Sequence, residues 1–202
     1  MIVLRLRQIA LSVLVIGVIA SPSAVHAAPA ATRTAENQVT AAATITWTLA
    51  RAQNPTADQQ DAYARITSAM NAAVARYNAL SDLGKSITVH YVPGVPTADG
   101  NINGSIRFGS NRSYMNERTA LHETAHTLGV GLSGGWRTLG GSGSWTGAQA
   151  TALVRQYDGA NAVLRTGGGH FWPYGLNYDN EFSQTNADRH VWIVVAMKRD
   201  GL

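Results

Sequence analysis

The feature that most restricts how this chain can fold is the run His-Glu-Thr-Ala-His at residues 122–126. It lies within Tyr114–Leu128, a stretch with no proline and no glycine, and Gly129 follows directly. Residues four apart on a helix lie one above the other on the same face. The segment therefore predicts a helix that begins near Asn116 and ends at Gly129.

This spacing has a chemical meaning. On a helix, the imidazoles of His122 and His126 can reach one tetrahedral zinc ion together. Glu123 stands one residue along, so its carboxylate would lie beside the metal and not ligate it. It could then act as general base toward a water molecule that zinc activates. We therefore expect His122 and His126 as metal ligands and Glu123 as a catalytic residue.

The N-terminus indicates export. Arg5 and Arg7 precede an apolar run, Ile9–Ala20, which small residues follow up to Ala27. This is the order of a secretory signal peptide, and we expect cleavage after Ala27, with Ala28 as the new N-terminus. The predicted organisation is a signal peptide at 1–27 and one secreted domain at 28–202. An uncleaved membrane anchor is the alternative.

Size and charge limit the mature protein. Removal of 27 of the 202 residues leaves 175, which suits one domain. The chain has no cysteine, so the fold must rest on packing and on metal. The formal net charge of +4 falls to +2 when Arg5 and Arg7 are removed, and no basic stripe appears. We expect a monomer without a nucleic-acid partner or stable membrane insertion after cleavage.

The first clear helix is Thr56–Leu80. Gln59 stands three residues after Thr56, which is a capping-box signature. Apolar residues then recur at steps of three and four, the pattern of a helix packed on a core: Tyr63, Ile66, Met70, Val74 and Tyr77.

Strand signals lie on both sides of this helix. Residues alternate in strand fashion at Ile45, Trp47 and Leu49, although the alanines of Val39–Arg51 also suit a helix. Ser86–Val92 and Ile106–Phe108 read as strands, with a turn-rich stretch at Thr97–Gly104 between them.

Two more helices are expected after the motif. Thr146 with Gln149 would open one that runs to Tyr157, and Asn186 would cap the last, Ala187–Arg199. The order of elements predicts an α+β domain, with a small mixed sheet packed on helices that include the motif helix.

Residues 122–131, HETAHTLGVG, resemble the opening of the metzincin zinc peptidases, whose pattern is H-E-x-x-H-x-x-G-x-x-H. Gly129 matches that glycine, but Leu132 stands where the family has its third histidine. With His170–Tyr178 (HFWPYGLNY), the stretch from Leu121 to about Arg199 is similar to a group of secreted bacterial H-E-x-x-H proteins. The resemblance implies a zincin-like domain with one zinc ion per chain that hydrolyses peptide bonds.

The third ligand must come from elsewhere. His170 is the first candidate, because three glycines precede it and let a loop bring its imidazole close. Glu181 would give the His₂Glu set of the gluzincins, and Asp179 is similar to the ligand of the aspzincins. His190, at the start of the last helix, is expected to be a packed residue or one that supports a metal ligand.

Two tyrosines follow His170. The phenol of Tyr174 or Tyr178 could donate a hydrogen bond to the oxyanion of a tetrahedral intermediate. Aromatic packing around a turn is the alternative. Met197 lies within an apolar helix and is expected in the core.

The sequence leaves three functions to weigh. The first is a zinc metalloendopeptidase whose polypeptide substrate, an extracellular or cell-wall protein, adds to a sheet edge such as Ile106–Phe108. The second is a carbohydrate- or wall-binding protein with a vestigial metal site, because four of the five tryptophans follow the motif helix: Trp136, Trp145, Trp172 and Trp192. The third, purely structural zinc, is disfavoured because such sites usually have four protein ligands, often cysteines.

Overall fold

The computed structural model of the chain describes residues 44–202. The predicted signal peptide, its cleavage site after Ala27 and the lead-in that follows lie outside the described residues. Among the residues that are described, no helix combines the length and the apolar character that a membrane crossing requires.

A mixed sheet of four strands holds the N-terminal half together, in the order β1-β2-β4-β3. Its strands are β1 (Ile45–Leu49), β2 (Lys85–Tyr91), β3 (Ala98–Asn101) and β4 (Ser105–Phe108). The first three in spatial order run parallel, and β3 pairs antiparallel with β4 at the edge. One face is buried through Ile87, Val89 and Ile106 while alternate residues are exposed, so the helices cover a single face.

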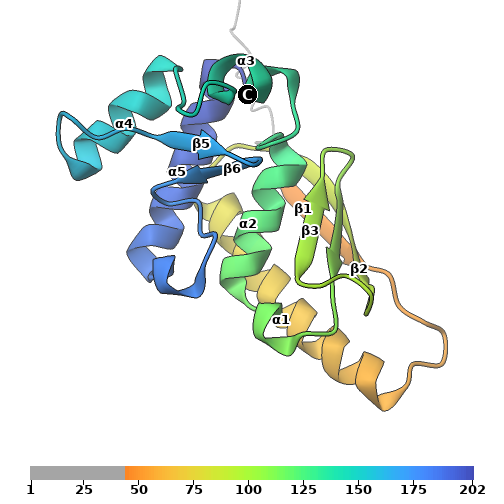
Figure 1. Cartoon of the computed structure of the whole chain (residues 1–202). Coiled ribbons are helices and arrows are strands. Elements are labelled where there is room, and N and C mark those ends of the chain that lie inside the picture. The colour runs from red at the N-terminus through yellow and green to blue at the C-terminus, as the bar shows by residue number, and fades with distance from the viewer. Residues whose placement is uncertain (1–43) are drawn as a thin grey trace, which may run out of the picture. The chain divides into compact units, whose positions relative to one another are not determined.

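Two helices lie on that face (Figure 1). Helix α1 (Ala57–Leu80) begins with the predicted capping box, in which Thr56 and Gln59 exchange side-chain and backbone hydrogen bonds. It packs on β1 and β2, and helix α2 (Glu117–Leu128) packs on β3 and β4 and on α1. The chain is thus α+β, with a small mixed sheet packed on helices, as its sequence predicts.

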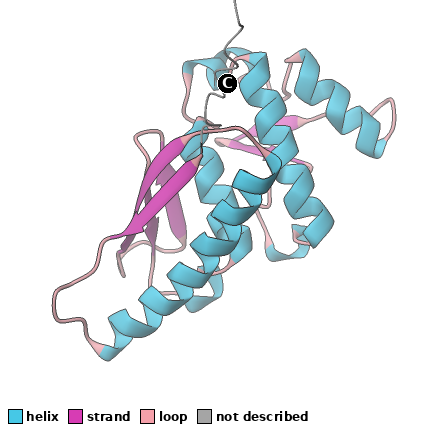
Figure 2. Cartoon of the chain, turned by 180° about the vertical axis from the view of Figure 1, so that it is seen from behind, coloured by secondary structure: helices cyan, strands magenta, loops and turns pink. Residues whose placement is uncertain are grey.

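The C-terminal half is mainly helical (Figures 1 and 2). It contains α3 (Gly134–Gly140), α4 (Ala148–Asp158) and α5 (Gln184–Asp200), together with a hairpin of β5 (Arg165–Gly167) and β6 (His170–Trp172). Two 3-10 turns complete the elements, Arg112–Tyr114 and Asp179–Glu181. Helix α5 packs on α1, α2 and α4, so it joins the two halves.

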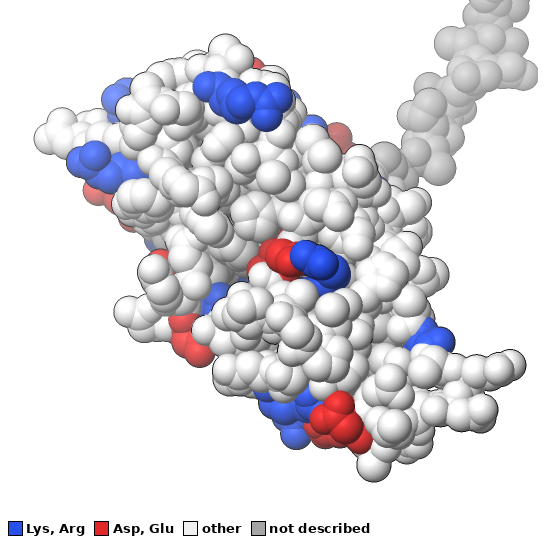
Figure 3. All heavy atoms as spheres, turned by 45° about the vertical axis from the view of Figure 1, so that its right-hand side comes forward, with Lys and Arg blue, Asp and Glu red and all other residues white. Residues whose placement is uncertain are grey.

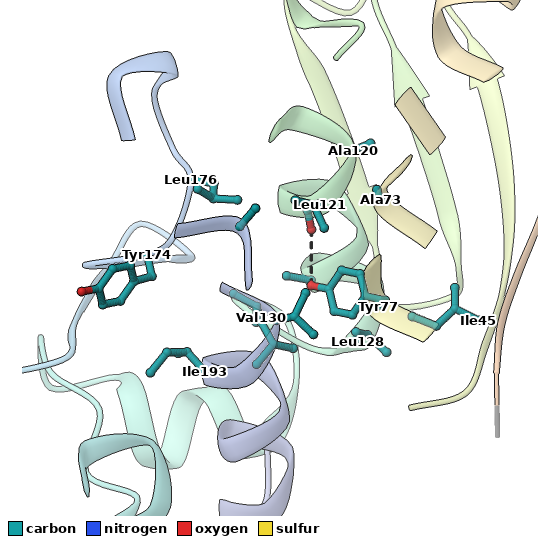
Figure 4. Close-up of a cluster of buried hydrophobic side chains, with 14 of the residues drawn as sticks. Ile45, Ala73, Tyr77, Ala120, Leu121, Leu128, Val130, Tyr174, Leu176 and Ile193 are labelled. Atoms are coloured by element: carbon teal, nitrogen blue, oxygen red, sulfur yellow. Dashed lines mark hydrogen bonds between the residues drawn. The ribbon is translucent and has the colours of Figure 1, made fainter. Parts of the chain in front are cut away.

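A continuous core runs between the halves (Figure 4). The Tyr77 hydroxyl from α1 lies within hydrogen-bond distance of the Leu121 carbonyl in α2 (3.4 Å) and of the His190 ring in α5 (3.1 Å). Met197 is fully buried, as predicted. These contacts fix the motif helix against two others.

Several element boundaries differ from the sequence predictions. The turn-rich stretch Thr97–Gly104 contains strand β3, because its backbone finds hydrogen-bond partners in β4. The expectation that Ile106–Phe108 forms a sheet edge is wrong, since β4 lies between β2 and β3.

Two predicted helix caps are also wrong. Helix α4 begins after Gly147, and its first amides at Gln149 and Ala150 bond the distant Asp200 carboxylate and not Thr146. Ser183 caps α5 by accepting from the Asn186 amide.

Candidate metal centre

The site is built on helix α2. Asn116 caps the helix by accepting a hydrogen bond from the Thr119 amide, and Gly129 ends it with φ +121°. The helix buries Leu121, Ala125 and Leu128 in the core. These boundaries confirm the predicted helix and leave the motif residues on its other side, facing a cleft.

Three imidazoles gather at this place. His122, His126 and His170 each offer one ring nitrogen, and these nitrogens lie within 4.8 Å of one another. The rings of His122 and His170 are stacked, with centroids 5.1 Å apart and planes at 22°. Among residues 44–202 this is the group of three side chains that could hold a metal ion. The prediction that His170 joins the helical pair is thereby supported by its position.

The hydrogen bonds of the helical pair orient both rings toward a common point. Nδ1 of His122 donates to the Gly175 carbonyl (2.8 Å), and Nδ1 of His126 donates to the Val130 carbonyl (2.9 Å). Since a carbonyl oxygen only accepts, each Nδ1 carries the proton and each Nε2 keeps its lone pair.

The distance between the two remaining nitrogens suits a metal. The two Nε2 atoms lie 3.2 Å apart. Two neutral imidazoles that both turn lone pairs inward gain nothing from this approach unless a cation lies between them. Two nitrogens bound to a tetrahedral zinc at 2.0–2.1 Å are about 3.3 Å apart. The residues present therefore fit such an ion.

Burial keeps the imidazoles neutral. It lowers the pKa of His122 well below its usual value, and the neighbouring His126 adds to the effect. Burial also lowers the pKa of His126 and that of His170, against backbone hydrogen bonds at Val130 and Gly168 that raise them. Neutral imidazole is the form that binds metal.

Glu123 is the acidic group beside the three rings. Its side chain is buried and lines the same cleft. Burial, and after it the charge of Asp99, raise its pKa to about 8, although Arg118 opposes this shift. A cation held by the imidazoles would favour the carboxylate form, because an opposite charge nearby stabilises it. The position suits a group that accepts a proton from water.

The cleft has a volume of about 1100 Å³. Helix α2 contributes His122, His126 and Glu123 to the lining of the cleft, and strand β3 forms one side. The rest comes from the turn at Gly131–Leu132, the hairpin segment 167–172 and the loop 177–181.

A buried arginine joins the helix to that loop. Arg118 lies one turn before His122 and is only 5% exposed. Its guanidinium donates to the Leu176 carbonyl (2.9 Å) and to Asp179 (2.6 Å). These bonds hold the loop whose Gly175 carbonyl orients His122. Arg118 is not among the residues that the motif pattern predicts, although its place four residues before His122 puts it on the same helical face.

The other candidate ligands have different partners. Glu181 lines the cleft, but its carboxylate accepts from the Asn177 amide (2.8 Å). Asp179 pairs with Arg118. His190 is fully buried and stacked on Phe171, as a packed residue would be. The structure brings none of the three into the group of imidazoles.

The two candidate tyrosines, Tyr174 and Tyr178, lie in different places. Tyr178 lines the cleft and is 71% exposed. The Tyr174 hydroxyl points away from α2 (Figure 4) and donates to Asp158 (2.6 Å). Tyr174 also has a positive φ of 68°, in the left-handed region. The structure does not bring Tyr174 to the metal centre, so an oxyanion role there rests on Tyr178.

The tryptophans divide in the same way. Trp136 and Trp145 are buried against each other in the core. Trp172 and Trp192 are exposed, and Trp172 lines the cleft.

On the face in Figure 3, the charged side chains of the described residues stand in small groups, often of both signs, with wide uncharged areas between them.

Comparison with known proteins yields no match: no model of a protein family, no curated protein and no solved structure is significantly similar to this chain.

Proposed function

We propose that this chain is a secreted, zinc-dependent metalloendopeptidase of the zincin type. The observation that carries the proposal is the convergence of His122 and His126, whose Nε2 atoms lie 3.2 Å apart with their lone pairs turned inward. His170 completes the set with one more nitrogen. A catalytic zinc site has three protein ligands and one open position, and such a set fits it.

A zinc ion held by His122, His126 and His170 would act as a Lewis acid and would lower the pKa of a bound water molecule from about 15.7 to about 7. Glu123 takes the proton of the attacking water at its carboxylate and later passes it to the leaving amine nitrogen. Tyr178 lines the same cleft, and its hydroxyl would donate a hydrogen bond to the developing oxyanion.

Strand β3 supports a polypeptide as the substrate. The Thr97 carbonyl accepts a hydrogen bond from the Gly109 amide, which follows β4. In the alternating antiparallel pattern, the backbone N–H and C=O groups of residues 97, 99 and 101 therefore point toward β4. Ala98 and Gly100 then turn their N–H and C=O groups to the free edge, and both line the cleft. An extended peptide could add there as a further strand.

Digestion of a denatured-protein mixture tests the proposal, with cleavage sites read by mass spectrometry. Zinc-loaded protein should cut internal peptide bonds, a chelator should stop the cutting, and added zinc should restore it. Zinc-loaded protein that leaves the mixture intact, or that cuts equally in chelator, would contradict the proposal.

The second candidate is a carbohydrate- or wall-binding protein, which the exposed Trp172 in the cleft favours. Saturable binding of wall polysaccharide without any peptide cleavage, lost in Trp172→Gln, would support this candidate.

A further inference from the structure

Exposed hydrophobic side chains concentrate at the cleft. Six large ones are exposed in the part of the chain that the structure describes: Ile102, Leu132, Val163, Trp172, Tyr178 and Trp192. Three of the six line this one cleft, namely Leu132, Trp172 and Tyr178. Exposed apolar groups gathered in a concave site indicate a ligand that covers them.

Leu132 and Trp172 belong to one wall. Leu132 follows Gly131, whose backbone touches that of Gly169. Trp172 is at the end of strand β6, and its indole reaches across the hairpin so that a Cβ on Gly167 would lie 3.2 Å from it. Both side chains line the same cleft as His126 and His170.

The segments that form this wall, 131–132 and 167–172, contribute no charged side chain to the cleft, since the His170 imidazole is neutral. The charged side chains that line the cleft are on β3, on α2 before His126 and on the loop 177–181: Asp99, Arg118, Glu123 and Glu181. A charged substrate side chain against Leu132 and Trp172 would lose water and find no partner there. An apolar side chain has no hydrogen bonds to water to lose, and it would cover exposed apolar surface.

We propose that Leu132 and Trp172 bind a large apolar side chain of the substrate, and that the enzyme cuts the peptide bond beside that residue. The inference rests on the proposed function and names its specificity. Trp172 lies two residues after His170 on β6, and Leu132 follows the Gly131 that contacts Gly169. The residue that they hold is therefore assigned to the position next to the scissile bond.

A set of peptides that differ at a single position tests this, with Leu, Phe, Gly, Asp or Lys on either side of one bond. Two measurements are made: cleavage by the zinc-loaded protein, and binding to zinc-loaded Glu123→Gln by fluorescence anisotropy. We expect Leu and Phe to be preferred over Gly by about 10- to 200-fold on one side of the bond, and over Asp and Lys by at least as much.

Substitutions assign the preference to the wall. Leu132→Lys and Trp172→Gln should each remove most of it. Ile102→Lys and Trp192→Gln are matched controls, because these side chains are equally exposed (42% and 37%) but do not line the cleft. They should leave the preference unchanged.

The outcomes separate the two claims. Chelator-sensitive cleavage with no apolar preference, or with a preference that survives both wall substitutions, would overturn this inference and leave the proposed function standing. Wall-dependent binding of the Leu and Phe peptides without cleavage would support the binding of an apolar side chain by Leu132 and Trp172 and contradict the endopeptidase. Neither binding nor cleavage would overturn both.

Discussion

Gly131 and Gly169 touch through their backbones, and this contact joins the chain that leaves helix α2 to the strand that carries His170. Gly131 has φ +75°, and a Cβ built on it would overlap the Gly169 carbonyl. No other residue type allows both the left-handed conformation and the close approach without strain. The contact explains how residues far apart in the chain form one site.

Gly131→Ala should therefore weaken both the fold and the site. We expect the free energy of unfolding to fall by about 1–2 kcal/mol from the left-handed conformation alone, and zinc affinity to fall as His170 is displaced. Urea denaturation and chelator competition measure the two effects. Gly134→Ala is the control, because nothing lies within 4 Å of its Cβ position. Equal zinc affinity in the two variants would show that the contact does not position His170.

Glu123→Gln should keep the fold and the metal but lose turnover. The side chain is nearly isosteric, yet an amide cannot accept the proton from water. Proton transfer by a positioned base contributes about 10²–10⁴ in rate, and we expect a loss in that range. Metal analysis and peptide hydrolysis on the same sample test this. Near wild-type turnover in a zinc-loaded variant would place the base elsewhere.

Tyr178→Phe and Tyr174→Phe should behave differently. Loss of an oxyanion donor lowers kcat by about 10²–10³, which we expect for Tyr178 with little change in stability, since its side chain is 71% exposed. Tyr174→Phe breaks the bonds to Asp158 and Arg189, so it should lower stability and leave kcat nearly unchanged. The reverse pattern of kcat effects would refute the assignment of Tyr178.

His190 should make the fold sensitive to acid. Burial lowers its pKa to about 4, against hydrogen bonds to the Tyr174 and Leu121 backbones that raise it. Below about pH 6.5 the unfolded chain takes up a proton that the folded chain refuses, so stability falls as the pH drops toward 4. The shift corresponds to about 3 kcal/mol.

Urea denaturation between pH 7 and 4.5 in chelator measures this loss. His190→Gln should be less stable at pH 7 but should lose less on acidification than the wild type. An unchanged pH dependence in His190→Gln would mean that His190 is not the group responsible.

The sequence predicts the parts of the fold that local chemistry determines. Asn116 and Gly129 bound α2, and Thr56 with Gln59 opens α1, because each cap uses neighbours in the chain. Strand β3 was not predicted, since its residues favour turns and only pairing with β4 makes them a strand. Likewise, the amides at the start of α4 are satisfied by Asp200, some fifty residues away, and no local pattern reveals such a partner.

In the candidate site, too, some features depend on neighbours in the chain and others on distant partners. The spacing of His122 and His126 on a helix is local, and it is confirmed by their converging Nε2 atoms. The place of His170 depends on the backbone contact between Gly131 and Gly169, which a run of glycines permits but does not dictate. The direction of Tyr174 depends on its left-handed backbone and on Asp158, and neither can be read from the sequence.

The most direct test of the account is the zinc content of protein purified without chelator, measured on the wild type, His170→Ala and His90→Ala. We predict about one zinc per chain in the wild type and in His90→Ala, whose side chain is on β2 and does not line the cleft. His170→Ala should lose most of its zinc. A wild-type content near zero that does not rise when zinc is added would contradict the metal centre. Full zinc in His170→Ala together with loss in Glu181→Gln would contradict the ligand set.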